Sequence, residues 1–68
     1  MTAQQQHWLT SHMGEVVEID GEACVLFYVI PFAGAVALHD QAGRVRLASA
    51  ERVTRAWLAQ NKLIGRET

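Results

Sequence analysis

Four arginines in the second half of the chain have the spacing of a basic binding patch. Arg44 and Arg46 are two positions apart in a predicted strand, so both side chains are expected on its outward face. Arg52 and Arg55 are three positions apart in a predicted helix and would be neighbours on its surface. If this helix folds beside the strand, the four guanidinium groups form one patch that could contact phosphates. The alternative is that they are solvated or pair with acidic side chains within the fold.

A second charged group, this one acidic, surrounds the first predicted turn. It consists of Glu15, Glu18, Asp20 and Glu22. These carboxylates could mimic phosphates, bind a basic partner or ligate a cation, although their spacing matches no EF-hand loop. The simpler interpretation is a solvated hairpin whose charges discourage pairing with other chains.

The histidines and the single cysteine do not form a chemical motif in the sequence. His7 and His12 are five positions apart, which does not place them on one helical face, and His39 lies far along the chain. Cys24 lies within an apolar strand, where a thiol is inert. No glycine-rich phosphate loop occurs in the sequence. We therefore expect no enzyme, no metal site, no cofactor and no small-molecule substrate.

The aromatic residues divide into two predicted roles. Trp8 and Trp57 lie at helical spacing with apolar neighbours and are predicted to pack their helices onto a sheet, although each could instead anchor a partner. Phe32 lies in a turn between Pro31 and Gly34, where burial is not assured. An exposed phenylalanine on a turn would be the better anchor for a protein partner.

The net charge of −1 conceals two halves of opposite charge. Residues 1–40 hold five acids and no lysine or arginine, whereas residues 41–68 hold all six basic residues and two acids. The halves therefore carry −5 and +4. In a folded chain they either neutralise each other or present two oppositely charged faces.

The chain of 68 residues predicts one domain over residues 1–68, and its 50% hydrophobic content argues against disorder. Its single cysteine excludes an intramolecular disulfide. The predicted elements are a helix over 3–13 capped by Thr2 and ended by Gly14, strands over 15–19, 24–30, 35–39 and 44–47, and a helix over 50–64 capped by Ser49 with Gly65 beyond it. Asp20-Gly21 predicts a two-residue hairpin that pairs Ile19 with Glu22.

These elements predict an α+β fold. Its sheet would be a small antiparallel meander of three or four strands, with one helix at the N-terminus and one at the C-terminus. A strongly curled version would resemble an SH3-like barrel in architecture only. In the last strand, Val45 and Leu47 are expected to point inward, because they alternate with arginines.

The strand over 24–30 is apolar on both faces, which predicts cover on both sides. The second helix can cover one face, and either the first helix or a partner chain can cover the other. Because a domain of this size has a thin core, self-association is expected.

The sequence as a whole predicts a small non-catalytic protein that binds another macromolecule, most simply a protein. The predicted contact residues are Phe32, Arg44, Arg46, Arg52 and Arg55. The alternative is a nucleic-acid-binding module that uses the four arginines. The polar start and the short apolar run over 23–33 indicate a soluble protein of the cytoplasm with no membrane partner. The excess of arginine over lysine and the frequent alanine are typical of a GC-rich bacterial genome or its mobile elements.

Overall fold

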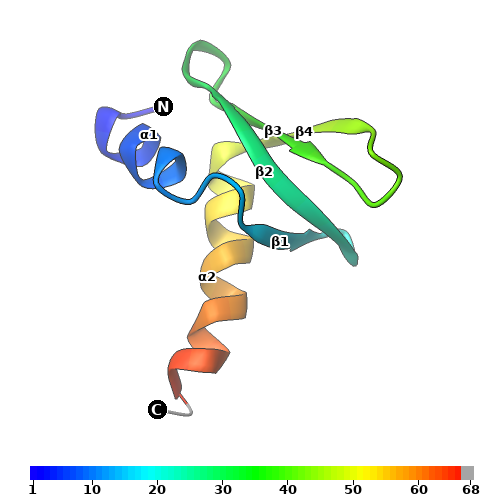
Figure 1. Cartoon of the computed structure of the whole chain (residues 1–68). Helices are drawn as coiled ribbons and strands as arrows, with labels where there is room; N and C mark the ends of the chain where they lie inside the picture. Colours follow the sequence, from blue (N-terminus) through cyan, green and yellow to red (C-terminus); the bar gives the residue numbers. More distant parts are fainter. Residues whose placement is uncertain (67–68) are drawn as a thin grey trace.

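The computed structural model describes the backbone of residues 1–66 and the side chains of residues 1–61. In chain order its elements are α1 (Ala3–Thr10), β1 (Val16–Ile19), β2 (Glu22–Ile30), the 3-10 turn η1 (Pro31–Ala33), β3 (Ala35–His39), β4 (Val45–Ser49) and α2 (Ala50–Arg66). The four strands form one antiparallel sheet in the order β1-β2-β3-β4 (Figure 1). The predicted α+β fold, a meander with a helix at each end, is confirmed.

The β1–β2 hairpin forms as predicted. Asp20 and Gly21 have φ angles of 54° and 79°, the two positive values that a tight hairpin turn of this kind requires. Ile19 pairs with Glu22 and the register continues along β1. Two backbone hydrogen bonds, from Gly14 N to the Leu26 carbonyl at 2.8 Å and from Leu26 N to the Glu15 carbonyl at 3.0 Å, extend the ladder beyond β1.

Helix α1 begins as predicted but ends earlier. The Thr2 hydroxyl accepts a hydrogen bond from Gln5 N at 3.1 Å, which caps the helix. The helix ends at Thr10 rather than Met13 because side chains, and not the backbone N–H of His12, bond to the Trp8 carbonyl. Ser11 Oγ donates a hydrogen bond to this carbonyl at 2.7 Å, and His12 Nδ1 lies 2.6 Å from it. His12 N bonds to the Leu9 carbonyl instead.

Strand β2 contains a bulge that changes which side chains face outward. Leu26 pairs with Leu38 and Tyr28 pairs with Ala37, so Phe27 is the extra residue. Without the bulge, Tyr28 would follow Leu26 into the core, because side chains alternate along a strand. With it, both Phe27 and Tyr28 are exposed and Val29 returns to the core side.

The prediction for the faces of β4 is wrong. Val45 and Leu47 are 60% and 66% exposed and lie on the outer face, whereas Arg46 lies on the inner face opposite Leu38. The register with β3 decides this, because Leu38 belongs to the core and its cross-strand neighbour must share its face. The Asp40–Gly43 turn holds that register: Asp40 Oδ1 accepts hydrogen bonds from the backbone N–H groups of Ala42 and Arg44, both at 2.9 Å.

Helix α2 runs from Ala50 to Arg66 and is capped by the Ser49 hydroxyl, which accepts a hydrogen bond from Arg52 N at 3.1 Å. It therefore extends past the predicted end at residue 64, and Gly65 lies inside it. The sequence predicts an apolar stripe of Ala50, Val53, Trp57 and Ile64 along this helix, and the side chain of Ile64 lies outside the described residues.

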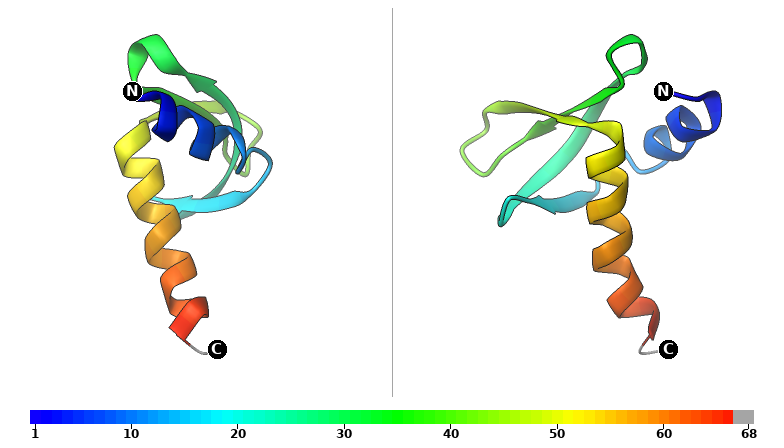
Figure 2. Two further views of the ribbon diagram at one scale, coloured as in Figure 1. Left: turned by 90° about the vertical axis from the view of Figure 1, so that its left-hand side faces the viewer. Right: turned by 180° about the vertical axis from the view of Figure 1, so that it is seen from behind.

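Both helices pack against one face of the sheet, which we call the inner face (Figure 2). The core is a single cluster of buried residues from both helices and from β1, β2 and β3: Leu9, Val17, Ile19, Cys24, Leu26, Val36, Leu38, Ala50 and Val53. The opposite, outer face of the sheet has no helix over it in the described part of the chain. Of the two covers considered for the apolar strand, α1 is therefore not the second one.

Candidate functional site

The arginines meet the acidic hairpin on the inner face. Arg46 forms a salt bridge with Glu22, Nη1 to Oε1, at 2.8 Å, and its Nη2 lies 3.9 Å from Asp20 Oδ2. Arg52, on α2, forms a salt bridge with the same Asp20. The tip of the β1–β2 hairpin is thereby tied to both β4 and α2, and the two oppositely charged halves of the chain neutralise each other here.

The other two predicted arginines lie apart from this cluster. Arg55 pairs with Glu51 on the same helix, as the four-residue spacing favours. Arg44 is exposed, and no described carboxylate forms a salt bridge with it. A phosphate must compete with any carboxylate that already pairs with a guanidinium group, which lowers what that group can contribute to binding. Three of the four arginines have such a partner within the chain.

Phe32 is the most exposed large apolar side chain of the described residues, at 94%. It lies in η1, which Pro31 begins and Gly34 ends with a φ of 62°. Pro31 has a restricted φ, Gly34 N donates a hydrogen bond to the Pro31 carbonyl at 3.2 Å, and Ala50 N donates one to the Gly34 carbonyl at 2.9 Å, so both ends of the turn are held. The phenyl ring is therefore presented to solvent on an ordered turn.

A groove of about 330 Å³ lies beside this turn, between α1 and β2. Its walls are Gln6 and Thr10 from α1, Met13 from the segment after α1, and Phe27, Tyr28, Val29 and Pro31 from β2 and the turn. None of these side chains is charged. A groove of this composition suits an apolar side chain whose neighbouring polar groups can bond to an amide or a hydroxyl.

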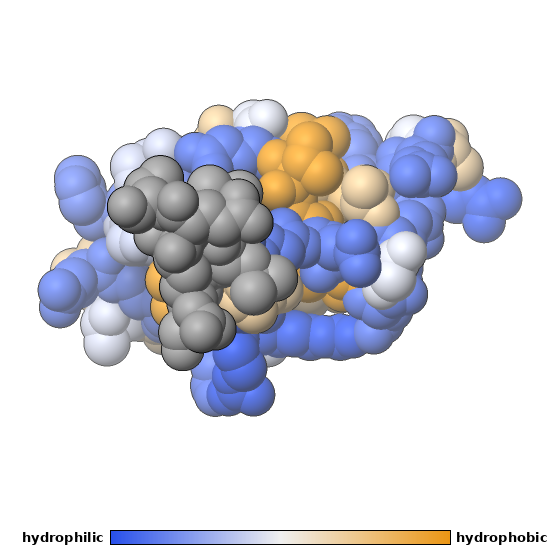
Figure 3. All heavy atoms as spheres, turned by 90° about the horizontal axis from the view of Figure 1, so that it is seen from below, coloured by the Kyte–Doolittle hydropathy of each residue, from blue (hydrophilic) through white to orange (hydrophobic). Residues whose placement is uncertain are grey.

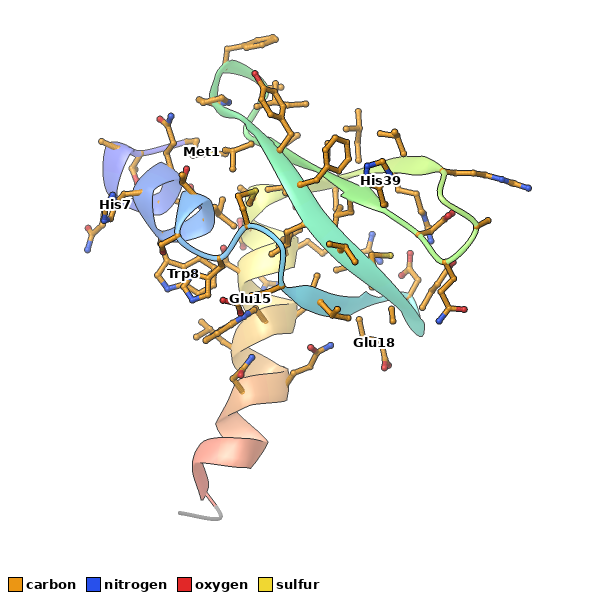
Figure 4. The ribbon with its side chains drawn as sticks, viewed as in Figure 1. Met1, His7, Trp8, Glu15, Glu18 and His39 are labelled. Carbon is orange, nitrogen blue, oxygen red and sulfur yellow. The ribbon has the colours of Figure 1, made fainter. Side chains whose placement is uncertain are left out.

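The outer face of the sheet carries a second apolar surface, which we call the outer patch. It consists of Val16, Val25, Phe27, Tyr28, Val45 and Leu47, all of which are exposed. The register places Val16, Val25, His39 and Val45 in one row across the four strands, and Tyr28, Ala37 and Leu47 in the next. His39 stacks on Phe27 with ring centroids 4.0 Å apart, and it lies on the side of the sheet away from α2 (Figure 4).

The sequence predicted a second apolar face on β2 that needs cover, but it did not predict that β4 extends this face, although two signals point to the whole outer patch. The first is the apolar run of β2 on both of its faces, which has more apolar side chains than one core face can hold. The second is the alternation of Val45 and Leu47 with arginines, which was assigned to the wrong face. Together they indicate an apolar surface that the chain itself does not bury.

The two tryptophans fill the space between the helices, as predicted for packing residues. The rings of Trp8 and Trp57 meet edge to face with centroids 5.1 Å apart, and His12 stacks on Trp8 at 4.1 Å. Trp57 Nε1 donates a hydrogen bond to Glu15 Oε1 at 2.8 Å, and Figure 4 shows Trp8 and Glu15 beside α2. His12 is thus part of this packing, and His7 lies exposed elsewhere on α1.

The remaining groups offer little reactivity. Cys24 is buried, and burial raises the pKa of its thiol from the ordinary value of 9.0 despite the nearby Arg46. Among the side chains of residues 1–61, no three His, Cys, Asp or Glu groups lie together as a metal ion would require.

Seen from below α2, the surface is mostly hydrophilic, with hydrophobic residues gathered in a compact group (Figure 3). Within the described part of the chain, neither helix has the length and hydropathy needed to cross a membrane.

The chain matches no protein-family model, and no curated protein or solved structure is significantly similar to it. The case for any function therefore rests on the surfaces described above.

Proposed function

We propose that this chain is a small non-catalytic module that binds another protein, with Phe32 as the anchor of the contact. The observation that carries the proposal is a phenyl ring almost fully exposed on an ordered turn. Burying such a side chain in a partner's pocket contributes about 1.5–3 kcal/mol. Because the turn is already ordered, little conformational entropy is lost when the partner binds.

The groove beside Phe32 supports the same proposal. It can receive an apolar side chain of the partner while Phe32 enters an apolar pocket of the partner, so that each protein contributes one anchor. Gln6 and Thr10 at its α1 wall can bond to the partner's backbone. The proposed partner is therefore a protein that pairs a small apolar pocket with a protruding apolar side chain.

Two further observations favour protein binding over the alternatives. The carboxylate partners of Arg46, Arg52 and Arg55 reduce what these arginines could offer to a nucleic acid. The buried thiol of Cys24 makes a poor nucleophile. The proposed setting is a bacterial cytoplasm, in keeping with the arginine- and alanine-rich composition.

Site-specific photo-crosslinking in the native host tests the proposal. A benzophenone amino acid is placed at Phe32, and a matched control carries it at Ala42, in the other exposed turn. We expect a discrete adduct with one host protein from position 32 and none from position 42. Purified complex should also be lost with Phe32→Ala and retained with Ala42→Ser.

Three outcomes would contradict the proposal. They are no adduct from position 32, the same adducts from both positions, or an adduct from position 32 that contains only two copies of this chain.

A further inference from the structure

The outer patch is a surface that the described chain leaves without cover. Both helices lie on the inner face, and the patch has six large apolar side chains that remain exposed. At their exposed fractions these side chains present about 600 Å² per molecule, the upper end of the range for the largest patch on a monomeric protein. A patch of this size is often functional, and an interface is one such function.

The patch is also poor in charge. Among the outward positions of the four strands, the register gives one charged side chain, Glu18, near the hairpin end of the edge strand β1. The centre of the patch holds the stacked pair of Phe27 and His39. A partner that covers this face therefore needs an apolar, nearly uncharged surface of similar size.

We propose that a second copy of this chain covers the outer patch, so that two sheets pack face to face. Complete burial of the patch on both copies would remove about 1,200 Å² from solvent, which is the lower limit for a stable specific interface. A second copy meets the requirement for a matching apolar surface, because a twofold interface uses the same patch on both molecules.

The register indicates how the two sheets would fit. With the twofold axis parallel to the strands, β2 of one copy lies over β3 of the other and β1 lies over β4. Val16 of one copy then meets Val45 of the other, and Tyr28 lies over the row of Ala37 and Leu47. Ala37 is buried by its own chain, so Leu47 is the exposed side chain of that row on β4. Sheets that pack face to face in this way lie about 10 Å apart.

The Phe32 side chain itself lies outside the proposed dimer contact, because it is in the turn after β2 rather than on the face of the sheet. The groove beside it shares Phe27 and Tyr28 with the outer patch, so the dimer would narrow access to the groove and leave Phe32 exposed. A dimer would carry two such turns. It would therefore bind two partner molecules, or one partner with two sites at raised avidity.

The test measures the mass of the full chain in solution by sedimentation equilibrium from micromolar to millimolar concentrations. We expect twice the single-chain mass of 7.5 kDa at the higher concentrations. Leu47→Glu and Val45→Glu should each weaken the dimer about 100-fold, because each would bury a carboxylate without a partner. The matched control is Leu58→Glu, which alters an exposed leucine on α2 and should leave the dimer unchanged.

Circular dichroism should show that the variants remain folded, since the altered side chains are exposed. In a mixture of isotope-labelled and unlabelled chains, intermolecular NMR contacts should join Val16 to Val45. The proposal is overturned if the chain stays monomeric at every concentration. A monomeric chain whose outer patch binds a different protein overturns it as well. It is also overturned if a dimer responds to Leu58→Glu and not to the two outer-patch variants. Phe32→Ala should not change the dimer mass, so a failure of this proposal and a failure of the Phe32 contact would be distinguishable.

Discussion

The inner and outer faces of the sheet differ in burial although both are rich in apolar side chains. The inner face places Val17, Leu26 and Leu38 under two helices, where they are almost completely buried. The outer face leaves Tyr28 and Leu47 more than half exposed. Hydrophobicity alone therefore does not tell which face forms the core of this small sheet, because both helices cover the same face and leave the other exposed.

The two faces also differ in the charged side chains that they carry. The inner face holds Arg46 at its margin, where Asp20 and Glu22 neutralise it. On the outer face, the register gives only Glu18 as a charged outward position. The ion pairs at the margin of the inner face join segments of the same chain. The outer face is nearly uncharged, as is typical of the core of an interface between chains.

The largest expected effect comes from truncating a core leucine. Leu26→Ala removes a side chain with 0% exposure, and such changes cost about 2–5 kcal/mol of unfolding free energy. The matched change on the outer face, Leu47→Ala, should cost at most about 0.5 kcal/mol at concentrations too low for association. Urea unfolding of both variants measures the difference. Equal losses would mean that the outer face is as well packed as the inner one.

A smaller effect is expected from the ion pairs at the inner margin. Arg46→Ala should lower the unfolding free energy by about 1 kcal/mol, because it removes contacts with two carboxylates and is only partly solvated. Arg55→Ala, the control, removes one exposed pair within a helix and should cost about 0.3–0.5 kcal/mol. The Arg46 effect should shrink with added salt, as measured by urea unfolding. An unchanged loss at high salt would show that packing of the arginine stem, not its charge, is what matters.

The smallest expected effect is a loss of unfolding free energy at alkaline pH that depends on the thiol of Cys24. Burial raises the pKa of this thiol above the ordinary value of 9.0, so the folded chain keeps the proton where the unfolded chain has lost it. The stabilisation is thus fully present below pH 9 and is lost as the pH rises through the pKa of the folded state. Thermal unfolding between neutral pH and pH 10 should show a decline that Cys24→Ala abolishes. An identical decline in the variant would assign the effect to other groups.

Much of the fold could be predicted because local interactions specify it. The Asp20-Gly21 turn and the Thr2 and Ser49 caps each depend on residues at most three positions apart, and all three form as predicted. The end of α1 could not be predicted, because Ser11 and His12 compete for the Trp8 carbonyl only once the turn has formed.

The candidate surfaces were predictable in part. The exposure of Phe32 follows from its place between Pro31 and Gly34. The arginines were recognised as candidates from their spacing, and pairing with acidic side chains within the fold was the stated alternative. Which carboxylate pairs with which arginine was not predicted, since Asp20 lies 32 residues from Arg52. The outer patch was predicted only for β2, because alternation along β4 is equally consistent with either face.

The sequence by itself determined the turns, the helix caps and the order of helices and strands, since each follows from the conformational preferences of a few neighbouring residues. Only the tertiary structure decided which face of the sheet the helices cover, where the bulge at Phe27 redirects Tyr28, and which carboxylates neutralise the arginines. These outcomes depend on contacts between residues far apart in the chain. A pattern that repeats every two residues specifies that a strand has two faces, but not which of them is buried.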